Sequence, residues 1–189
     1  MRIWIVSLFE PTIVDNTRPM RYMSLQNALI DAGHEVTFYS CTFRHANKKK
    51  RFEKQHVHED DHYKTVFIEG PPYVKNFSYA RVKSHDTYTD NLLTYINHEP
   101  QKPDLIVCAF PPIDTAYRLS EWAKERGSKF ILDIIDPWPD VIEQAMPVIA
   151  LPLTKLAVWH YRKKVREILS RTDAVVAISK QYTDWASSL

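Results

Sequence analysis

The chain has 189 residues, of which 44% are hydrophobic and 25% are charged, and its formal net charge at pH 7 is +2. A chain of this length can bury a hydrophobic core, and this composition excludes a disordered or fibrous protein. Because domains that bind nucleic acid are usually strongly basic, such a balanced charge argues against a nucleic acid as partner.

The N-terminal apolar run, residues 2–8, predicts a strand rather than a signal peptide, because it lacks a small-residue cleavage site and leads directly into Glu10 and Pro11. The chain has no apolar stretch of about 18 residues, the length that a membrane-crossing helix needs. Its only cysteines, Cys41 and Cys108, lie in apolar stretches, so we expect buried thiols in a reducing compartment. The expected location is the cytoplasm, either free or peripherally attached to the inner face of the cell membrane.

Short apolar runs rich in β-branched residues predict the strands of one sheet. They are continuous rather than alternating, which is typical of strands covered on both faces in a parallel sheet. The predicted strands are residues 3–6, 36–39, 65–68, 105–108, 130–135 and 174–178. Segment 44–62 is dense in charged residues, and we expect it to be a solvated excursion between the second and third of these strands.

Helical periodicity predicts helices between these strands. The first opens at Pro19 and stops at Gly33, the second covers 77–97, the third covers 114–126 with Asp114 as its cap and Gly127 as its stop, and the fourth covers 153–170. This alternation predicts an α/β fold with a doubly wound, mostly parallel, Rossmann-like sheet. Ligands of such sheets bind beyond the carboxyl ends of the strands, so loops 9–17, 110–113 and 136–140 should carry the site.

The surroundings of one zinc-like motif and the positions of the glycines argue against a bound metal and against a nucleotide cofactor. The letters H-E-x-x-H at 58–62 form a zinc site only when both histidines share one face of a packed helix. No apolar stripe surrounds them, so we interpret the segment as a solvated, charged turn and expect no metal. The three glycines, Gly33, Gly70 and Gly127, fit neither the dinucleotide-binding fingerprint nor a P-loop, so we expect no cofactor.

The most informative loop is 136–140, which follows the strand predicted at 130–135. Pro137 and Pro139 stiffen it, so that Asp136, Trp138 and Asp140 face the crevice. An indole can cover the apolar CH face of a sugar, and carboxylates accept hydrogen bonds from its hydroxyl groups. The alternative is that Asp136 only caps the following turn and that Trp138 belongs to the core.

Four motifs follow one another along the chain. Arg21 leads into a helix that ends on G-H-E-V-T at 33–37, a Pro-Asp strand ending in Pro-Pro covers 103–112, the loop D-P-W-P-D occupies 136–140, and T-D-A-V-V-A-I-S covers 172–179. In this order and spacing the chain resembles the N-terminal half of family-four glycosyltransferases of the GT-B architecture, especially bacterial enzymes that build O-antigen, capsule or exopolysaccharide. The resemblance spans nearly all of the chain.

The resemblance implies that residues 1–189 are the acceptor-side, Rossmann-like half of a GT-B enzyme, and that the C-terminal domain holding the donor is absent. It implies retaining transfer of a sugar from a nucleotide diphosphate sugar to a glycan or lipid-linked acceptor, without an obligatory metal, and a fragment that is inactive alone. The alternative is a standalone, non-catalytic module that binds a glycan or lipid-linked sugar. Loop 9–17 has no glycine, and Ala109 and Ile135 stand where many members carry a histidine, which keeps this alternative open.

Asp136 is the residue that we predict to be catalytic, because it combines a strand-end position, a stiff loop and the matching family motif. The residues expected to bind substrate beside it are Glu10, Arg21, Pro111, Trp138 and Asp140. Arg21 is expected in the first turn of the first helix, where it and the helix dipole favour an anion such as a phosphate. An ordinary surface arginine is the alternative there.

The helix expected at 153–171 is both basic and apolar, which suggests attachment to an anionic membrane. Its basic residues are Lys155, Arg162, Lys163, Lys164, Arg166 and Arg171, and its apolar and aromatic residues are Leu156, Val158, Trp159, Tyr161, Val165, Ile168 and Leu169. The alternative is a helix that packs its apolar side on the sheet and shows its charges to water. Both can hold in part, with Trp159 and Leu169 in the core while the basic residues face lipid.

Overall fold

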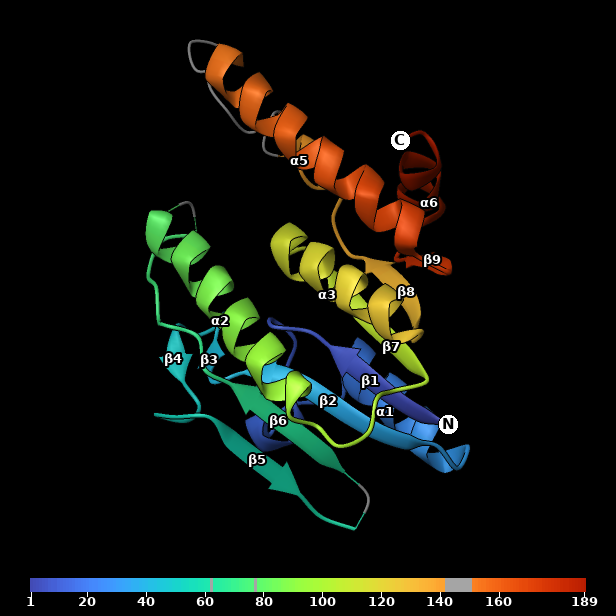
Figure 1. The fold of residues 1–189 in the computed structure, drawn as a ribbon. Coiled ribbons are helices and arrows are strands. Elements are labelled where there is room, and N and C mark those ends of the chain that lie inside the picture. Colours follow the sequence, from blue (N-terminus) through green and yellow to red (C-terminus); the bar gives the residue numbers. More distant parts are fainter. Residues whose placement is uncertain (62, 77, 142–150) are drawn as a thin grey trace. The chain divides into compact units, whose positions relative to one another are not determined.

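The computed structural model describes residues 1–61, 63–76, 78–141 and 151–189, and side chains are described for these residues except 151–157. The chain forms two compact units, unit 1 (Met1–Val107) and unit 2 (Cys108–Leu189), and each is described by itself. Figure 1 shows the elements of both.

The described residues of unit 1 form three helices and most of the strands. The strands are β1 (Arg2–Val6), β2 (Glu35–Cys41), β3 (Phe43–Arg44), β4 (Lys49–Lys50), β5 (His56–Glu59) and β6 (Lys64–Ile68). The helices are the short 3-10 helix η1 (Ile13–Asp15), α1 (Arg21–Asp31) and α2 (Tyr79–Asn97). Strand β7 (Leu105–Phe110) begins in this unit and ends in unit 2.

Unit 2 continues from the end of β7 with α3 (Ile113–Arg126), β8 (Lys129–Ile134), α5 (Leu151–Arg171), β9 (Ala174–Ala177) and α6 (Lys180–Ser187). In the part of the chain that the structure describes, the central sheet has seven strands in the order β5-β6-β2-β1-β7-β8-β9, and a separate two-stranded sheet pairs β3 with β4. The α/β class and a mostly parallel central sheet flanked by helices are thus confirmed.

The core of unit 1 lies around β1, β2 and β6. β1 pairs in parallel with β2, where Ile5 is opposite Phe38, and β2 pairs in parallel with β6, where Tyr39 is opposite Val66. These side chains are all fully buried. Burial of each large apolar side chain contributes about 1.5–3 kcal/mol, which explains why continuous apolar runs form the inner strands.

Helix α2 covers part of this sheet (green in Figure 1) and packs against β6. Its buried Tyr88 donates a long hydrogen bond, 3.5 Å, to the carbonyl oxygen of Tyr39, and the rings of Tyr39 and Tyr95 lie 6.1 Å apart. The side chain of Ser78 caps the helix by accepting from the backbone N–H of Arg81. The second predicted helix is therefore confirmed; Phe77, its expected first residue, lies outside the described residues.

In unit 2, β8 pairs in parallel with β9, with Leu132 opposite Val175. Helices α3 and α5 lie side by side (Figure 1) and are joined by a hydrogen bond of 2.9 Å from the Tyr117 hydroxyl to Glu167. Val158, Val165 and Ile168 form the buried stripe of α5. Their helical spacing explains why α5 turns this side inward.

Several expectations about individual elements are wrong. Strand β9 is not covered on both faces, since Val176 is 43% exposed. Pro112 rather than Asp114 is the N-cap residue of α3. Asp114 lies in the first turn, where the positive end of the helix dipole still stabilises a carboxylate. The first helix begins at Arg21, two residues after Pro19. The stops are confirmed, because Gly33 and Gly127 have the positive φ angles, 80° and 66°, that glycine adopts easily.

Segment 44–62 is not simply a solvated excursion, because within it β4 pairs with β3 and β5 is the antiparallel edge strand beside β6. Both cysteines are buried free thiols, as expected, and burial raises the pKa of Cys41 to about 11. Among the described residues, none of the helices is both long enough and apolar enough to span a membrane.

Candidate functional site

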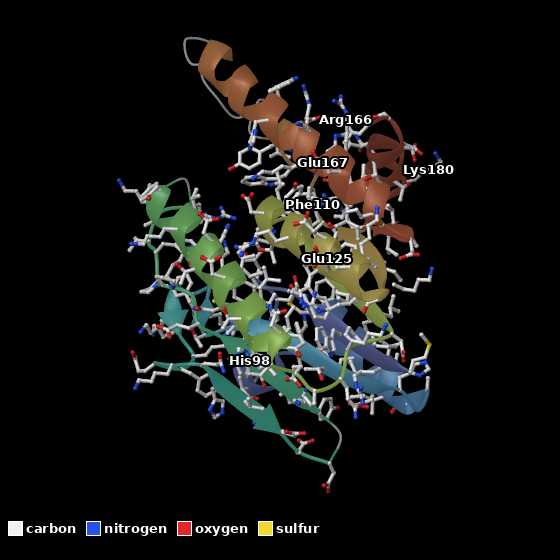
Figure 2. The ribbon with its side chains drawn as sticks, viewed as in Figure 1. His98, Phe110, Glu125, Arg166, Glu167 and Lys180 are labelled. Carbon is white, nitrogen blue, oxygen red and sulfur yellow. The ribbon has the colours of Figure 1, made fainter. Side chains whose placement is uncertain are left out.

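Two strand-end loops of unit 2 lie next to each other. β7 ends at Phe110, labelled in Figure 2, and β8 ends at Ile134. The backbone N–H of Ile135 donates to the carbonyl oxygen of Phe110 at 2.9 Å. Pro111 and Asp136, the next residue of each loop, therefore start from one edge of the sheet, as the sequence predicts for parallel strands.

Loop 136–140 is a tight turn. The N–H of Trp138 donates to the carbonyl oxygen of Asp136 at 2.9 Å, and that of Asp140 donates to the carbonyl oxygen of Pro137 at 3.1 Å. The side chain of Asp136 is exposed, whereas Trp138 is partly buried. In the described part of the chain, the carboxylate of Asp136 has neither a hydrogen bond nor an ion pair, so it does not act as a side-chain cap for the turn.

Asp140 holds this loop in place. Its Oδ1 accepts from Nε of Arg162 in α5 at 2.9 Å, and its Oδ2 accepts from the indole nitrogen of Trp185 in α6 at 2.9 Å. The ring of Trp185 also lies 6.3 Å from that of Phe110. Asp140, expected to bind substrate, thus has both carboxylate oxygens engaged by its own chain, and these hydrogen bonds tie loop 136–140 to α5 and α6.

Helix α5 neutralises part of its positive charge within unit 2. Lys164 forms an ion pair with Asp114, and Arg171 lies 3.4 Å from Glu167. Trp159, which the alternative reading of this helix places in the core, is instead 61% exposed, and Lys163 is exposed too. The side chains of Lys155 and Leu156 lie outside the described residues. Helix α5 is therefore an amphipathic helix that packs against α3 and carries the exposed indole of Trp159. Its ion pairs leave fewer unpaired basic side chains than the sequence alone suggests.

A buried ion pair fixes the loop after β1 in unit 1. Asp15 and Arg51 are 2.8 Å apart, with 4% and 5% of their side chains exposed. Arg51 also donates to the carbonyl oxygens of Cys41 at 2.8 Å and Glu10 at 3.2 Å. Asp15 accepts from the backbone N–H of Thr12 at 2.8 Å, which completes the capping of η1. Loop 9–17 is therefore held by its own carboxylate.

The electrostatics of Asp15 reflect two opposing effects. Burial raises its pKa, but the hydrogen bonds from Arg51 and the Thr12 backbone, with the charges of Arg51 and Arg44, outweigh burial. The net result is a pKa below the ordinary aspartate value, so Asp15 is ionised at neutral pH.

The two other predicted contact residues also lie in unit 1. Glu10 is partly buried in the loop after β1, four residues past the end of the strand, and its backbone carbonyl accepts a hydrogen bond from Arg51. Arg21 is the first residue of α1, which confirms its predicted place in the first turn of this helix, and its side chain is exposed. Sequence reasoning missed Asp15 and Arg51, because nothing in a charge-rich segment marks which arginine is buried.

The H-E-x-x-H letters do not form a zinc helix. His58 and Glu59 lie in strand β5 rather than in a helix or in the expected turn, and His62 lies outside the described residues. Among the residues that the structure describes, no group of three or more His, Cys, Asp or Glu side chains is arranged to hold a metal ion.

Comparison with known proteins adds no family to this picture. No protein-family model matches the chain, and no curated protein matches it significantly.

Proposed function

We propose that this chain is the acceptor-side half of a two-domain, GT-B type glycosyltransferase, with a doubly wound sheet and a sugar site at the carboxyl edge of β7 and β8. One observation carries the proposal: the hydrogen bond from Ile135 to Phe110 brings together two strand-end loops, one with an exposed acid and a partly buried indole. Open α/β sheets bind their ligands at such an edge.

The two side chains suit a carbohydrate for complementary reasons. The face of the Trp138 indole can cover the apolar CH surface of a sugar ring, and the Asp136 carboxylate can accept hydrogen bonds from two hydroxyl groups. Pro137 and Pro139 restrict the backbone, so little conformational entropy is lost when the sugar binds. In the proposed reaction Asp136 orients the acceptor while a second Rossmann-like domain presents the nucleotide diphosphate sugar.

A second candidate function is a module that binds a glycan or lipid-linked sugar without transferring it. The engagement of both Asp140 oxygens by Arg162 and Trp185 favours this candidate, because among the described residues it leaves Asp136 as the one acid of the loop without a hydrogen bond or ion pair to its carboxylate. A single carboxylate is sufficient to bind hydroxyl groups, whereas transfer needs further groups at the reacting centre.

Turnover separates these two functions. In the protein together with its donor-binding domain, release of nucleoside diphosphate from a panel of nucleotide sugars is measured with the wild type and with Asp136→Asn. A catalytic contact predicts that the variant loses on the order of 100-fold in turnover while keeping its circular dichroism spectrum. Binding of a glycan without any turnover favours the module, and neither binding nor turnover contradicts both.

The matched control is Glu125→Gln. Glu125, labelled in Figure 2, is an exposed acid near the C-terminal end of α3, which begins after the carboxyl end of β7 and leads back to the start of β8. The substitution Glu125→Gln therefore removes one negative charge from the same unit, but at the opposite edge of the sheet from Asp136. We expect no change in turnover.

We also propose that the enzyme contacts an anionic membrane through the outer side of α5, where an acceptor that is lipid-linked would be presented. The exposure of Trp159 and of Lys163 supports this, because aromatic and basic side chains together favour the interface. The ion pairs of Lys164 and Arg171 reduce the charge available, so the attachment should be weak and sensitive to salt.

A further inference from the structure

A second group of side chains, remote in sequence from loop 136–140, forms a cationic cluster in unit 1. Its members come from the β3–β4 turn, the segment after β6, and the first two turns of α2, all of which Figure 1 shows in unit 1. Nζ of Lys48 lies 3.0 Å from Nδ1 of His45 and 2.7 Å from Oδ1 of Asn76. The hydroxyl of Tyr73 lies 2.6 Å from the same Nδ1. We call His45, Lys48, Tyr73, Arg81 and His85 the basic cluster.

Aromatic rings hold the basic cluster together. Lys48 Nζ lies 4.7 Å from the centre of the Tyr73 ring, and the guanidinium of Arg81 lies 5.5 Å from that of Phe9. The ring of Phe9 is 5.2 Å from His45 and 5.4 Å from His85. Lys48 and Arg81 are thus each held over an aromatic ring, and both are partly exposed.

The hydrogen bonds define the state of His45. A lysine ammonium can only donate, so Nδ1 is the acceptor and the neutral imidazole carries its proton on Nε2. Burial, then Lys48 and Arg81, lower the pKa of His45. Burial, then Arg81 and His45, lower the pKa of His85 to about 3. Burial and Arg81 lower the pKa of Lys48 as well, so the charges acting on these three groups are positive.

The backbone places these cations where they repel one another. Lys48 has a φ of 57°, the left-handed region that costs a residue with a side chain roughly 1–2 kcal/mol. Arg81 lies in the first turn of α2, where the helix dipole already presents positive charge. The repulsion between these cations, and between Arg81 and the helix dipole, is offset when an anion binds between them.

We propose that the basic cluster binds a phosphate group, with Lys48 and Arg81 as its charged donors and the N-terminus of α2 behind them. A phosphate carries nearly two negative charges at pH 7 and offers three acceptor oxygens, which suits two cations better than a carboxylate would. The source is a soluble phosphate or diphosphate, or the phosphate of a lipid headgroup. This site goes beyond the sugar site of unit 2 and is independent of sugar transfer.

The first test uses inorganic pyrophosphate and the 189-residue chain at low salt. Isothermal titration should show binding in the millimolar range or tighter, weakened at least about tenfold by Lys48→Gln and by Arg81→Gln. Lys83→Gln is the matched control, since Lys83 is an exposed cation on the same helix. The proposal is contradicted if all three variants bind pyrophosphate equally. It is also contradicted if the wild type binds neither pyrophosphate nor vesicles that contain a phosphate-monoester lipid.

A second measurement on the wild type does not depend on how the variants fold. The pKa of His45, followed by NMR, should rise when pyrophosphate saturates the chain, because an anion offsets the charges of Lys48 and Arg81. An unchanged His45 pKa at saturation means that pyrophosphate binds elsewhere and contradicts the proposal.

Vesicles distinguish the source of the phosphate. Sedimentation is compared for phosphatidylcholine vesicles with and without a lipid whose headgroup is a phosphate monoester. Loss of binding in Lys48→Gln and not in Lys83→Gln assigns the site to a headgroup. Lys48-dependent binding of pyrophosphate without such sedimentation assigns it to a soluble phosphate.

Discussion

The indole nitrogen of Trp185 donates to Oδ2 of Asp140 at 2.9 Å and so ties α6 to the loop that carries Asp136. Arg162 engages the other oxygen of the same carboxylate. A charge-assisted hydrogen bond contributes roughly 1.5–3 kcal/mol, and the 25% exposure of Asp140 reduces this.

We therefore expect Asp140→Ala to lower the free energy of unfolding by about 1–2 kcal/mol in a urea titration followed by tryptophan fluorescence. Asp184→Ala is the control on α6, because its ion pair with Lys180 is exposed and should change stability by less than about 0.5 kcal/mol. Equal effects of the two substitutions would show that Asp140 does not hold the loop.

The buried pair of Asp15 and Arg51 should dominate the stability of loop 9–17. Removing one partner leaves the other charge buried and uncompensated, so Asp15→Asn should cost about 3 kcal/mol. Glu53→Gln, in the exposed pair with Lys50, is the control and should cost almost nothing.

The same pair has a defined pH dependence. The folded-state pKa of Asp15 is below its unfolded value, so its stabilisation is present above about pH 4 and is lost as the pH falls through the folded pKa. Unfolding free energies between pH 5 and 2 should therefore decline less steeply in Asp15→Asn than in the wild type. Parallel declines would contradict the assignment.

His85 should make the protein sensitive to milder acid. Its folded pKa of about 3 lies below the unfolded value of about 6.5, so the unfolded state takes up a proton first. The contribution of neutral His85 to the free energy of unfolding is fully present above about pH 6.5 and decreases as the pH falls towards 3. His85→Gln, which stays neutral, should flatten this decline between pH 6.5 and 4, whereas His98→Gln, an exposed position at the end of α2, should not.

The sequence predicts the fold well where local signals agree. Continuous apolar runs identify the inner strands, and Gly33 and Gly127 mark helix ends because their positive φ angles favour glycine. Helix α6 and the short strands β3, β4 and β5 were missed, since they are short and their pairing depends on neighbours distant in sequence.

The candidate site was predictable only in part. Strand order and the two prolines predict that loop 136–140 lies at the carboxyl edge of the sheet, and the structure places it there. The engagement of Asp140 by Trp185 and Arg162 depends on α6 and α5, which are 45 and 22 residues away. The basic cluster likewise joins residues of a charged segment to α2, and the left-handed φ of Lys48 has no sequence signal.

Trp159 and Lys163, both exposed on α5, should contribute to the proposed membrane attachment. Trp159→Ser and Lys163→Gln are each expected to reduce sedimentation with anionic vesicles several-fold, since a cation near such a surface contributes about 1 kcal/mol. Binding should weaken with added salt. Lys180→Gln, an exposed lysine on α6, is the control; vesicle binding equal for neutral and anionic lipid would contradict the proposal.

The central claim is that the carboxyl edge of β7 and β8 binds sugar, and the indole N–H signal of Trp138 reports on it most directly. In an NMR titration with a panel of glycans and nucleotide sugars, we predict that at least one ligand shifts the Trp138 signal. Asp136→Asn should abolish that shift, and Glu125→Gln should preserve it. If no ligand moves the Trp138 signal at millimolar concentration, or if Asp136→Asn responds like the wild type, the account is wrong.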